Sequence, residues 1–444
     1  MRVNAKQVAL VAADIISFYL ALTLALLLRS GLSFSFMLLR DHLGPFTAVA
    51  AIWLVVFWLA GLYDFRQVVV RMRHLRALLT AIIVALAVSV LLFYVVPSFR
   101  LTPKTILALL GFSFLVIGFP LREAIARHLV TLIPPRRVFV IGRGREVREL
   151  VDYLRAHLEL GYQVMAWLER PTVAAITEAI AAHQPDLLVV PARVGRGKAL
   201  SGEIFHELLR GAEVVTFATF YEQVFSKVSL EALGEDWFLE ELEPKQGFYL
   251  FLKRILDLIV ALIVLLITLP FWPLMALAVV TSSAGPVFKL LPRAGYREQN
   301  FTPYKFRTMH LAGDVPTKIG EHFGTQPDDT RVFPVGRWLR RLRLDELPQV
   351  LNVLRGELSF VGPRADFIDF YRHLKAKIPY YQVRTIVPPG LTGWAQIHDR
   401  YGSSLEGTRE RLAYDIYYIK HRSLVLDLVI LLKTIRTVCT FSGI

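Results

Sequence analysis

The stretch LIVALIVLLITLPFWPLMALAVV, residues 258–280, decides much of the fold because it runs for 23 residues without a charged side chain. About 20 apolar residues suffice for a helix to cross ~30 Å of hydrocarbon, so its length alone would allow a span. Pro270 and Pro273 lie inside it, and each removes a backbone donor and clashes with the preceding turn. We therefore predict a re-entrant helix over residues 255–280, broken at these prolines. A proline-kinked spanning helix is the alternative, since membrane helices tolerate such kinks.

Basic residues flank this run on both sides, with Lys253 and Arg254 before it and Lys289 and Arg293 after it. Lysine and arginine gather on the cytoplasmic side of membrane segments. Both ends of the broken helix are therefore predicted to lie at the cytoplasmic face.

Four apolar runs of near-spanning length precede it, at residues 8–28, 46–62, 77–96 and 105–121. Basic residues concentrate after the second and fourth runs, which predicts a multi-pass protein of the inner (cytoplasmic) membrane with its N-terminus and everything beyond residue 121 inside. The first run is too long for a signal peptide and lacks a small-residue cleavage site. Asp14 is the only charge within these runs, and we expect it to be paired or to snorkel to the interface.

The composition of the 444 residues fits a membrane protein, with 54% hydrophobic residues and a net charge of +14. Such a charge suits anionic headgroups, phosphorylated substrates or nucleic acid. No nucleic-acid-binding motif is recognisable and the basic residues cluster beside membrane segments, so no nucleic-acid partner is expected. The single cysteine, Cys439, excludes an internal disulfide and any cysteine-rich metal site.

Residues 136–245 alternate short β-branched runs with helical ones, which predicts a small parallel sheet of the Rossmann-like type. Gly142 and Gly144 match the first two glycines of a dinucleotide-binding turn. Val147 replaces the third, and Glu169 follows Gly142 by 27 residues rather than the ~20 of the fingerprint. We interpret this domain as a fold relic or a site for another ligand.

Beyond residue 300 the sequence is rich in cations around one pair of acids, Asp345 and Glu346. Arginine and lysine bind phosphate oxygens, so this pattern favours phosphoryl chemistry with a metal balancing the charge. Three of the arginines share a helical face opposite Trp338, which predicts a helix in the membrane interface with those arginines facing headgroups. The cations are Lys305, Arg307, Arg331, Arg337, Arg340, Arg341, Arg343, Arg355, Arg364 and Arg384, and Arg337, Arg340 and Arg341 form the shared face.

Asp345 and Glu346 precede Pro348, which favours the first turn of a helix, and Gly356 predicts that helix's end. A helix N-terminus stabilises ionised carboxylates, as a nucleophile or a metal ligand requires. The alternative is a charge pair that only stabilises the helix start.

Residues 250–444 resemble the bacterial sugar transferases, or large monotopic phosphoglycosyl transferases. The resemblance rests on KRILD (253–257), GPV (285–287), YKFRTM (304–309), LDELPQ (344–349), NVLRG (352–356), SFVGPR (359–364), PGLTGWAQ (389–396) and YDIYYIK (414–420). It implies a membrane α plus α/β protein with a four-helix transmembrane region (1–135), the Rossmann-like domain (136–245) and a catalytic α/β domain carrying the re-entrant helix (246–444).

The resemblance also implies transfer of a sugar 1-phosphate from a UDP-sugar to polyprenyl (undecaprenyl) phosphate, with release of UMP and initiation of exopolysaccharide or related glycan assembly. Asp345 is implied as the attacking carboxylate and Glu346 as its partner, one or both near Mg²⁺. Lys305, Arg307 and Arg364 are implied as phosphate-binding residues, and Arg331 is a further substrate-binding candidate from the cation cluster. The sugar, the pathway and the oligomeric state stay open, with a homodimer as one option.

Three residues depart from the family's pattern. Leu291 stands where glutamine is usual, Arg343 where a small hydroxyl residue is usual, and Ala365 where a second proline is usual. Two alternatives remain, a membrane-bound nucleotide-sugar dehydratase or epimerase and a non-catalytic scaffold of polysaccharide assembly. The first needs a Tyr-xxx-Lys pair, and Tyr371 and Lys375 have that spacing, but no second glycine fingerprint precedes them.

Overall fold

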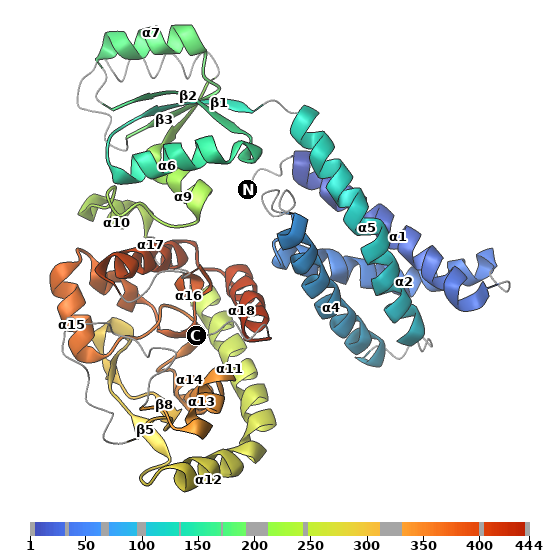
Figure 1. Ribbon diagram of the computed structural model, residues 1–444, viewed down its shortest axis with the longest axis vertical. Coiled ribbons are helices and arrows are strands. Elements are labelled where there is room, and N and C mark those ends of the chain that lie inside the picture. Colours follow the sequence, from blue (N-terminus) through green and yellow to red (C-terminus); the bar gives the residue numbers. More distant parts are fainter. Residues whose placement is uncertain are drawn as a thin grey trace. The chain divides into compact units, whose positions relative to one another are not determined.

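The computed structural model describes residues 5–31, 35–63, 71–95, 104–132, 135–169, 172–191, 212–242, 247–310, 331–398 and 404–439. The chain forms two compact units, Met1–Phe217 (unit 1) and Ala218–Ile444 (unit 2), whose elements are labelled in Figure 1. The three-domain division after residues 135 and 245 stays a prediction.

Unit 1 begins with four long apolar helices, α1 (Ala5–Ser30), α2 (Phe36–Leu59), α4 (Arg71–Val95) and α5 (Lys104–Leu132). Three contain a stretch long and apolar enough to cross a membrane, and α4 contains the shorter apolar stretch Ala77–Phe93. Helix α2 starts ten residues before the predicted run, where the Ser35 side chain caps it by accepting from the Leu38 N–H, and it continues through Pro45.

Asp14 is paired inside this helical bundle, which is one of the two outcomes that the sequence analysis expected. The Arg122 guanidinium on α5 donates to both carboxylate oxygens of Asp14 on α1, at 2.6 and 2.7 Å. The Tyr63 hydroxyl donates to the same carboxylate at 2.7 Å. Both charged side chains are buried, so the pair links the two helices in the bundle interior.

The second part of unit 1 is a parallel four-stranded sheet in the order β2-β1-β3-β4. Its strands are β1 (Arg136–Ile141), β2 (Tyr162–Leu168), β3 (Leu187–Val190) and β4 (Glu213–Thr216). Helices α6 (Arg145–Ala156) and α7 (Val173–His183) lie on opposite faces of the sheet (Figure 1). The strands follow the predicted runs, and the assignment to a nucleotide-binding fold stays a prediction.

The glycine turn after β1 is packed against the chain's own side chains. Gly142 has φ +149°, and a Cβ there would lie 3.5 Å from the side chain of Val147. The Trp167 indole donates to the Gly142 carbonyl at 2.9 Å. Glu169, the acid compared above with the fingerprint, lies 3.7 Å from Arg148 in an exposed ion pair.

Unit 2 begins with residues that the sequence had placed in the middle domain. These include α9 (Phe217–Phe225) and α10 (Glu235–Glu241). Val228 lies in a core with Leu374 and Ile416, and the Trp394 indole donates to the Ser226 carbonyl at 2.8 Å. Residues 218–242 therefore pack as part of unit 2.

The apolar helix of unit 2 is broken where the two prolines predicted. Helix α11 (Gly247–Thr268) leads through a 3-10 turn (η4, Leu269–Phe271) into α12 (Trp272–Ser282), with Pro273 in its first turn. Helix α12 turns away from the α11 axis (Figure 1). Ala261 of α11 packs with Val350, and Val279 of α12 packs with Phe306 and Leu339, so both arms lie against the same unit.

Short strands and helices make up the rest of unit 2. The strands pair as β5 (Phe288–Leu290) with β8 (Tyr304–Phe306), β6 (Arg293–Ala294) with β7 (Asn300–Phe301), and β9 (Ser359–Val361) with β10 (Gly390–Thr392). The helices are η5 (Tyr296–Glu298), α13 (Pro334–Arg341), η7 (Leu344–Gln349), α14 (Val350–Arg355), α15 (Ile368–Lys377), η8 (Tyr381–Ile386), α16 (Trp394–His398), α17 (Leu405–His421) and α18 (Leu424–Cys439).

Glycines allow the backbones around β9 and β10 to meet closely. A Cβ on Gly390 would lie 2.1 Å from the Gly362 nitrogen, and one on Gly393 would lie 2.2 Å from the Gly362 carbonyl oxygen. No side chain fits at such distances, so these positions require glycine for packing. The contact fixes the segment that carries Arg364.

Candidate active site

The acid pair lies in a 3-10 helix immediately before α14. Asp345 and Glu346 occupy the first turn of η7, which Arg343 precedes in a left-handed conformation with φ +57°. Helix α14 then ends at Gly356, with φ +84°, as predicted. The sequence predicts this helix over residues 349–355, and α14 begins one residue later, at Val350, with the two acids in the 3-10 helix that leads into it.

Lys305 joins the two acids. Its Nζ lies 2.7 Å from Oδ2 of Asp345 and 3.4 Å from Oε1 of Glu346. Lys305 is the central residue of β8, which pairs with β5 and thereby fixes the lysine's backbone. The Asp345 side chain is only 2% exposed, so this contact is made in a nearly dry environment.

Two arginines contact Glu346 from different elements. Arg364, which follows β9, places Nη2 3.3 Å from Oε1, and Arg343 places Nη1 3.9 Å from Oε2. The structure thus brings Lys305 and Arg364, both expected to bind phosphate, to the predicted dyad. It adds Arg343, which the sequence listed among the cations around the acids and as a departure from the family pattern, but not as a phosphate-binding residue.

The surroundings shift the pKa values of the two carboxyl groups in opposite directions. Burial raises the pKa of Asp345 above its ordinary value, and the charge of Lys305 offsets this only in part. Burial also acts to raise the pKa of Glu346, but Arg364, Lys305 and Arg343 outweigh it and hold that pKa well below its usual range. Glu346 is therefore a fixed negative charge at neutral pH, whereas Asp345 is a less stabilised and more reactive carboxylate.

Arg307 does not reach the dyad. It is 1% exposed, and its guanidinium donates to the carbonyls of Ser283, Ala284 and Pro286 in the loop after α12. These hydrogen bonds tie the guanidinium to that loop, so Arg307 positions the end of the broken helix. Arg331 is partly exposed, and its carbonyl accepts from the His310 N–H. Neither contributes an ion pair to the dyad in the described part of the chain.

Arg340 corrects one expectation about helix α13, which the sequence predicted to lie in the membrane interface. It was expected to face lipid headgroups, but its Nε donates to the Thr308 hydroxyl at 2.8 Å, so it turns inward. Arg337 and Arg341 are exposed, as is Trp338. The helical pattern identified the amphipathic face but not the tertiary partner that captures Arg340.

Arg293 is a site residue that the sequence gave only as a basic flank. It donates to the Ala365 carbonyl at 2.8 Å, lies over the Phe367 ring at 4.5 Å, and has a buried Nε with no partner among the described residues. Burial and the nearby charge of Arg364 lower its pKa to about 10, so it is still a cation at neutral pH. No local pattern marks it, because its neighbours come from residues about 70 positions later.

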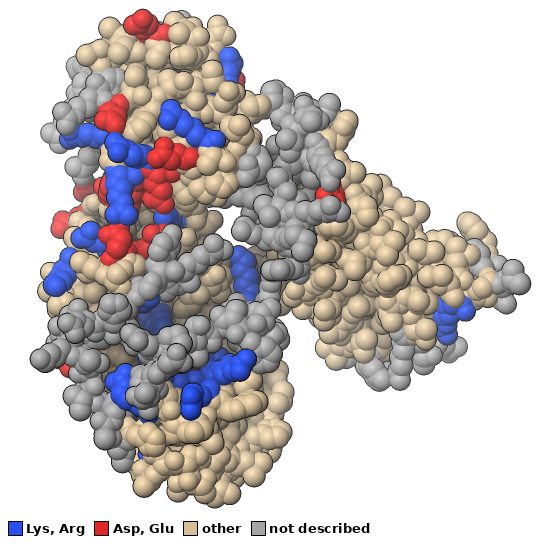
Figure 2. All heavy atoms as spheres, in the orientation of Figure 1, with Lys and Arg blue, Asp and Glu red and all other residues tan. Residues whose placement is uncertain are grey.

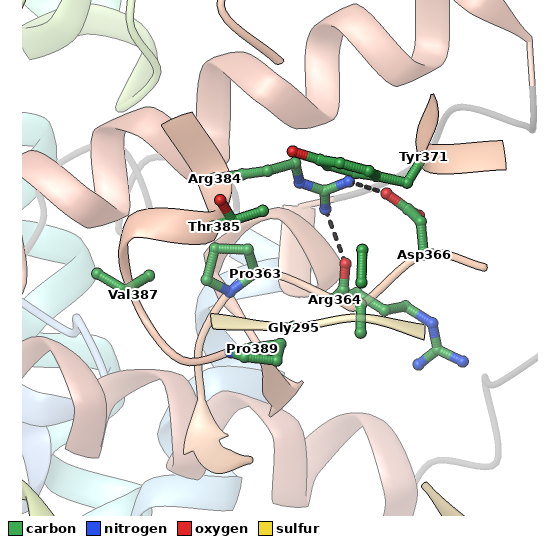
Figure 3. Close-up of a pocket in the computed structure, with 11 residues that line it drawn as sticks. Gly295, Pro363, Arg364, Asp366, Tyr371, Arg384, Thr385, Val387 and Pro389 are labelled. Carbon is green, nitrogen blue, oxygen red and sulfur yellow. Dashed lines mark hydrogen bonds and ion pairs between the residues drawn. The ribbon is translucent and has the colours of Figure 1, made fainter. Parts of the chain in front are cut away.

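A cavity of about 240 Å³, including its open mouth, adjoins the backbone of Arg364. Figure 3 shows the Arg364 side chain pointing away from Arg384, while its carbonyl faces Arg384. Arg384 donates to that carbonyl at 2.9 Å and forms ion pairs with Asp366 and Asp415. This buried network holds the backbone of Arg364 in place, despite the absence of the usual proline at residue 365.

The dyad offers oxygen ligands of the type that Mg²⁺ takes. No group of three or more histidine, cysteine or acidic side chains that could hold a metal exists among the described residues. Magnesium commonly binds through one or two carboxylates plus substrate phosphates and water. Asp345 and Glu346 therefore fit an ion that arrives with a diphosphate, rather than an ion held by protein alone.

Tyr371 and Lys375 have a structural role, because both bind the same glutamate. The Tyr371 hydroxyl and the Lys375 ammonium both contact Oε1 of Glu298, at 2.9 and 2.7 Å. Burial raises the pKa of Tyr371, whereas a catalytic tyrosine base needs a lowered one. The pair thus anchors the turn at Glu298, which disfavours the dehydratase or epimerase alternative.

The fold and site together define a class: a membrane protein with a broken apolar helix that supports an acid pair ringed by cations. The family model of the bacterial sugar transferases matches residues 248–441. The chain is 30% identical over 352 residues to the UDP-glucose:undecaprenyl-phosphate glucose-1-phosphate transferase of Xanthomonas campestris pv. campestris, covering 73% of this chain and 71% of that protein. The chain therefore belongs to the bacterial sugar transferase family.

Two further relatives match the catalytic part. One is the UDP-N-acetylgalactosamine-undecaprenyl-phosphate N-acetylgalactosaminephosphotransferase of Aeromonas hydrophila, 39% identical over 222 residues, or 50% of this chain and 51% of that protein. The other is a UDP-glucose:undecaprenyl-phosphate glucose-1-phosphate transferase of Caulobacter vibrioides, 40% identical over 190 residues, or 42% of this chain and 70% of that protein. The chain thus spans about half the length of the Aeromonas relative.

Proposed function

We propose that the protein transfers a sugar 1-phosphate from a UDP-sugar to undecaprenyl phosphate through a covalent intermediate on Asp345. The observation that carries this proposal is the buried Asp345 carboxylate, 2.7 Å from Lys305 and beside the ionised Glu346. Family membership supports the reaction class, and two relatives named for different sugars leave UDP-glucose and UDP-N-acetylgalactosamine as the first donors to test.

In the first step an Asp345 oxygen attacks the sugar-bearing phosphorus of the UDP-sugar. The bond from that phosphorus to the bridging oxygen breaks, and UMP leaves with the electron pair. Lys305 and Arg364 lie where they can hold the diphosphate oxygens, and Glu346 keeps both cations in place. A bound Mg²⁺, held by Asp345 and Glu346, would supply further neutralisation of the diphosphate charge.

In the second step a phosphate oxygen of undecaprenyl phosphate attacks the same phosphorus. The bond from phosphorus to Asp345 breaks, which regenerates the carboxylate and yields undecaprenyl diphosphate sugar. The low pKa of Glu346 favours a charge-holding role over proton transfer, because it stays ionised throughout.

We further propose that α11 and α12 form a re-entrant membrane helix, with the active site at the cytoplasmic face of the inner membrane. Exposed apolar side chains on both arms, such as Leu266, Leu274 and Leu277, support burial in lipid. The break at η4 and the packing of both arms on unit 2 support a return to the side of entry.

The order of events tests the chemical proposal. Purified protein, Mg²⁺ and UDP-sugar should release UMP in an amount equal to the enzyme before undecaprenyl phosphate is added. Asp345→Asn should abolish both UMP release and labelling by the phosphosugar, whereas Asp369→Asn, on the exposed part of α15, should leave both unchanged. Product formation only when both substrates are present, or near-normal turnover of Asp345→Asn, would contradict the covalent step.

A further inference from the structure

Arg343 occupies an unusual position between the interfacial helix and the dyad. It lies two residues after the end of α13 and adopts φ +57° and ψ +18°, a left-handed conformation that few residues other than glycine and asparagine adopt easily. Its side chain is 47% exposed, and its Nη1 lies 3.9 Å from Glu346. Such a long, solvent-exposed ion pair contributes little to stability, so an incoming anion can replace it at small cost.

Glu346 separates two sets of cations. Its Oε1 faces Lys305 and Arg364, and its Oε2 faces Arg343. Arg364 arises from the segment that Arg384 fixes, whereas Arg343 arises from the end of α13. Glu346 is therefore approached by cations from three elements: Lys305 from β8, Arg364 from the segment after β9, which lines the cavity of Figure 3, and Arg343 from the segment after α13.

With the re-entrant helix proposed above, the α13 side faces lipid. Leu339 of α13 packs with Val279 of α12, and α12 exposes Leu274 and Leu277 by 65% and 62%. Trp338 of α13 is 68% exposed, as suits an aromatic side chain at a membrane interface. In Figure 2 the end of unit 2 that α12 forms shows an uncharged surface, with basic side chains directly above it.

We propose that Arg343 binds the phosphate of the lipid acceptor, while Lys305 and Arg364 hold the phosphates of the nucleotide-sugar donor. This proposal rests on the transferase function proposed above. The acceptor's phosphate is tied to a chain in the bilayer, so it reaches the dyad from the α12 and α13 side, where Arg343 is the first cation in contact with Glu346. Arg343 is thus a binding residue that acts mainly in the second half-reaction.

Separate assays of the two half-reactions test this assignment. Arg343→Asn removes the charge but tolerates the left-handed backbone, and Arg343→Lys keeps the charge. For Arg343→Asn we expect a smaller loss in UMP release from UDP-sugar than in transfer, because Lys305 and Arg364 still contact Glu346. The undecaprenyl phosphate concentration needed for half-maximal transfer should rise about tenfold, the lower end expected for one charge-assisted contact. Arg343→Lys should recover most of this loss.

Arg297→Asn is the matched control, because Arg297 is also an exposed arginine in the left-handed conformation, with φ +51°. It should leave both half-reactions unchanged. The proposal is wrong if Arg343→Asn slows UMP release as much as transfer, or leaves the acceptor dependence unaltered. If the wild-type protein releases no UMP from any donor, the transferase proposal fails. Equilibrium binding of undecaprenyl phosphate in detergent micelles then still tests the role of Arg343. Arg343→Asn should bind undecaprenyl phosphate about tenfold more weakly than the wild-type protein.

Discussion

Removing the charge of each dyad acid should change stability in opposite directions. Glu346 accepts from Arg364 at 3.3 Å and Lys305 at 3.4 Å, and each such long, partly exposed contact contributes about 1 kcal/mol. Glu346→Gln should therefore destabilise the protein by roughly 2 kcal/mol. Asp345 is buried, and its burial disfavours the ionised form. Asp345→Asn should stabilise by up to about 1 kcal/mol, because Lys305 keeps Glu346 as its partner.

Thermal unfolding of the purified protein in detergent measures both effects. For a unit of roughly 150 to 250 residues, 1 kcal/mol corresponds to about 2–4 °C, so at pH 7 Glu346→Gln should lower the midpoint by about 4–8 °C. Asp345→Asn should raise it by up to about 4 °C. Equal losses for both variants, or a larger loss for Asp345→Asn, would refute the opposite environments inferred for the two acids.

The pH dependence follows from the same pKa shifts. The pKa of Glu346 is lowered in the fold, so its contribution to stability is present above the carboxyl group's unfolded pKa and is lost as pH falls through the folded value. The pKa of Asp345 is raised, so ionisation of Asp345 weakens the fold as pH rises through its folded value. The gain from Asp345→Asn should therefore grow between acidic and neutral pH. The loss from Glu346→Gln should stay constant above the unfolded carboxyl pKa and shrink progressively as the pH falls below it.

Two further predictions concern the membrane segments. Asp14→Asn should destabilise the protein by about 3–5 kcal/mol, because it leaves the buried Arg122 charge without its counter-ion. Asp41→Asn, at an exposed position of α2, should leave the stability unchanged. Equal melting midpoints for the two variants would show that the Asp14–Arg122 pair is dispensable. Leu250→Cys and Leu290→Cys, in a Cys439→Ser background, should both react with impermeant thiol reagents only from the cytoplasmic side, and labelling of either from outside would rule out the re-entrant helix.

Local chemistry was enough to predict the break in the apolar helix, the parallel strands of unit 1 and the end of α14 at Gly356. Each depends on residues adjacent in sequence, such as Pro273 or the β-branched run of β1. The pairing of Asp14 was predictable for the same reason, because a lone acid in an apolar run needs a counter-charge. Its partner Arg122 is 108 residues away and could not be read from the pattern.

The fate of each cation in the candidate site depended on contacts that sequence patterns do not specify. Lys305 and Arg307 are two residues apart, yet one reaches the dyad and the other binds the carbonyls after α12. The sequence shows how many cations lie near the acids along the chain. It does not show which of these cations instead donate hydrogen bonds to backbone carbonyls. Arg293 and Arg384 act through the backbone beside Arg364, and this role exists only once distant strands and helices have packed.

The close backbone contact among Gly362, Gly390 and Gly393 affects how family motifs should be weighed. These glycines belong to the sequence pieces by which the chain is recognised, yet they are required because no Cβ fits between the two chain segments. Selection for folding alone would keep them in a descendant that had lost Asp345 and Glu346. Such a descendant would still match the family, so in a genome survey the two acids, rather than the glycine motifs, separate candidate enzymes from inactive paralogues.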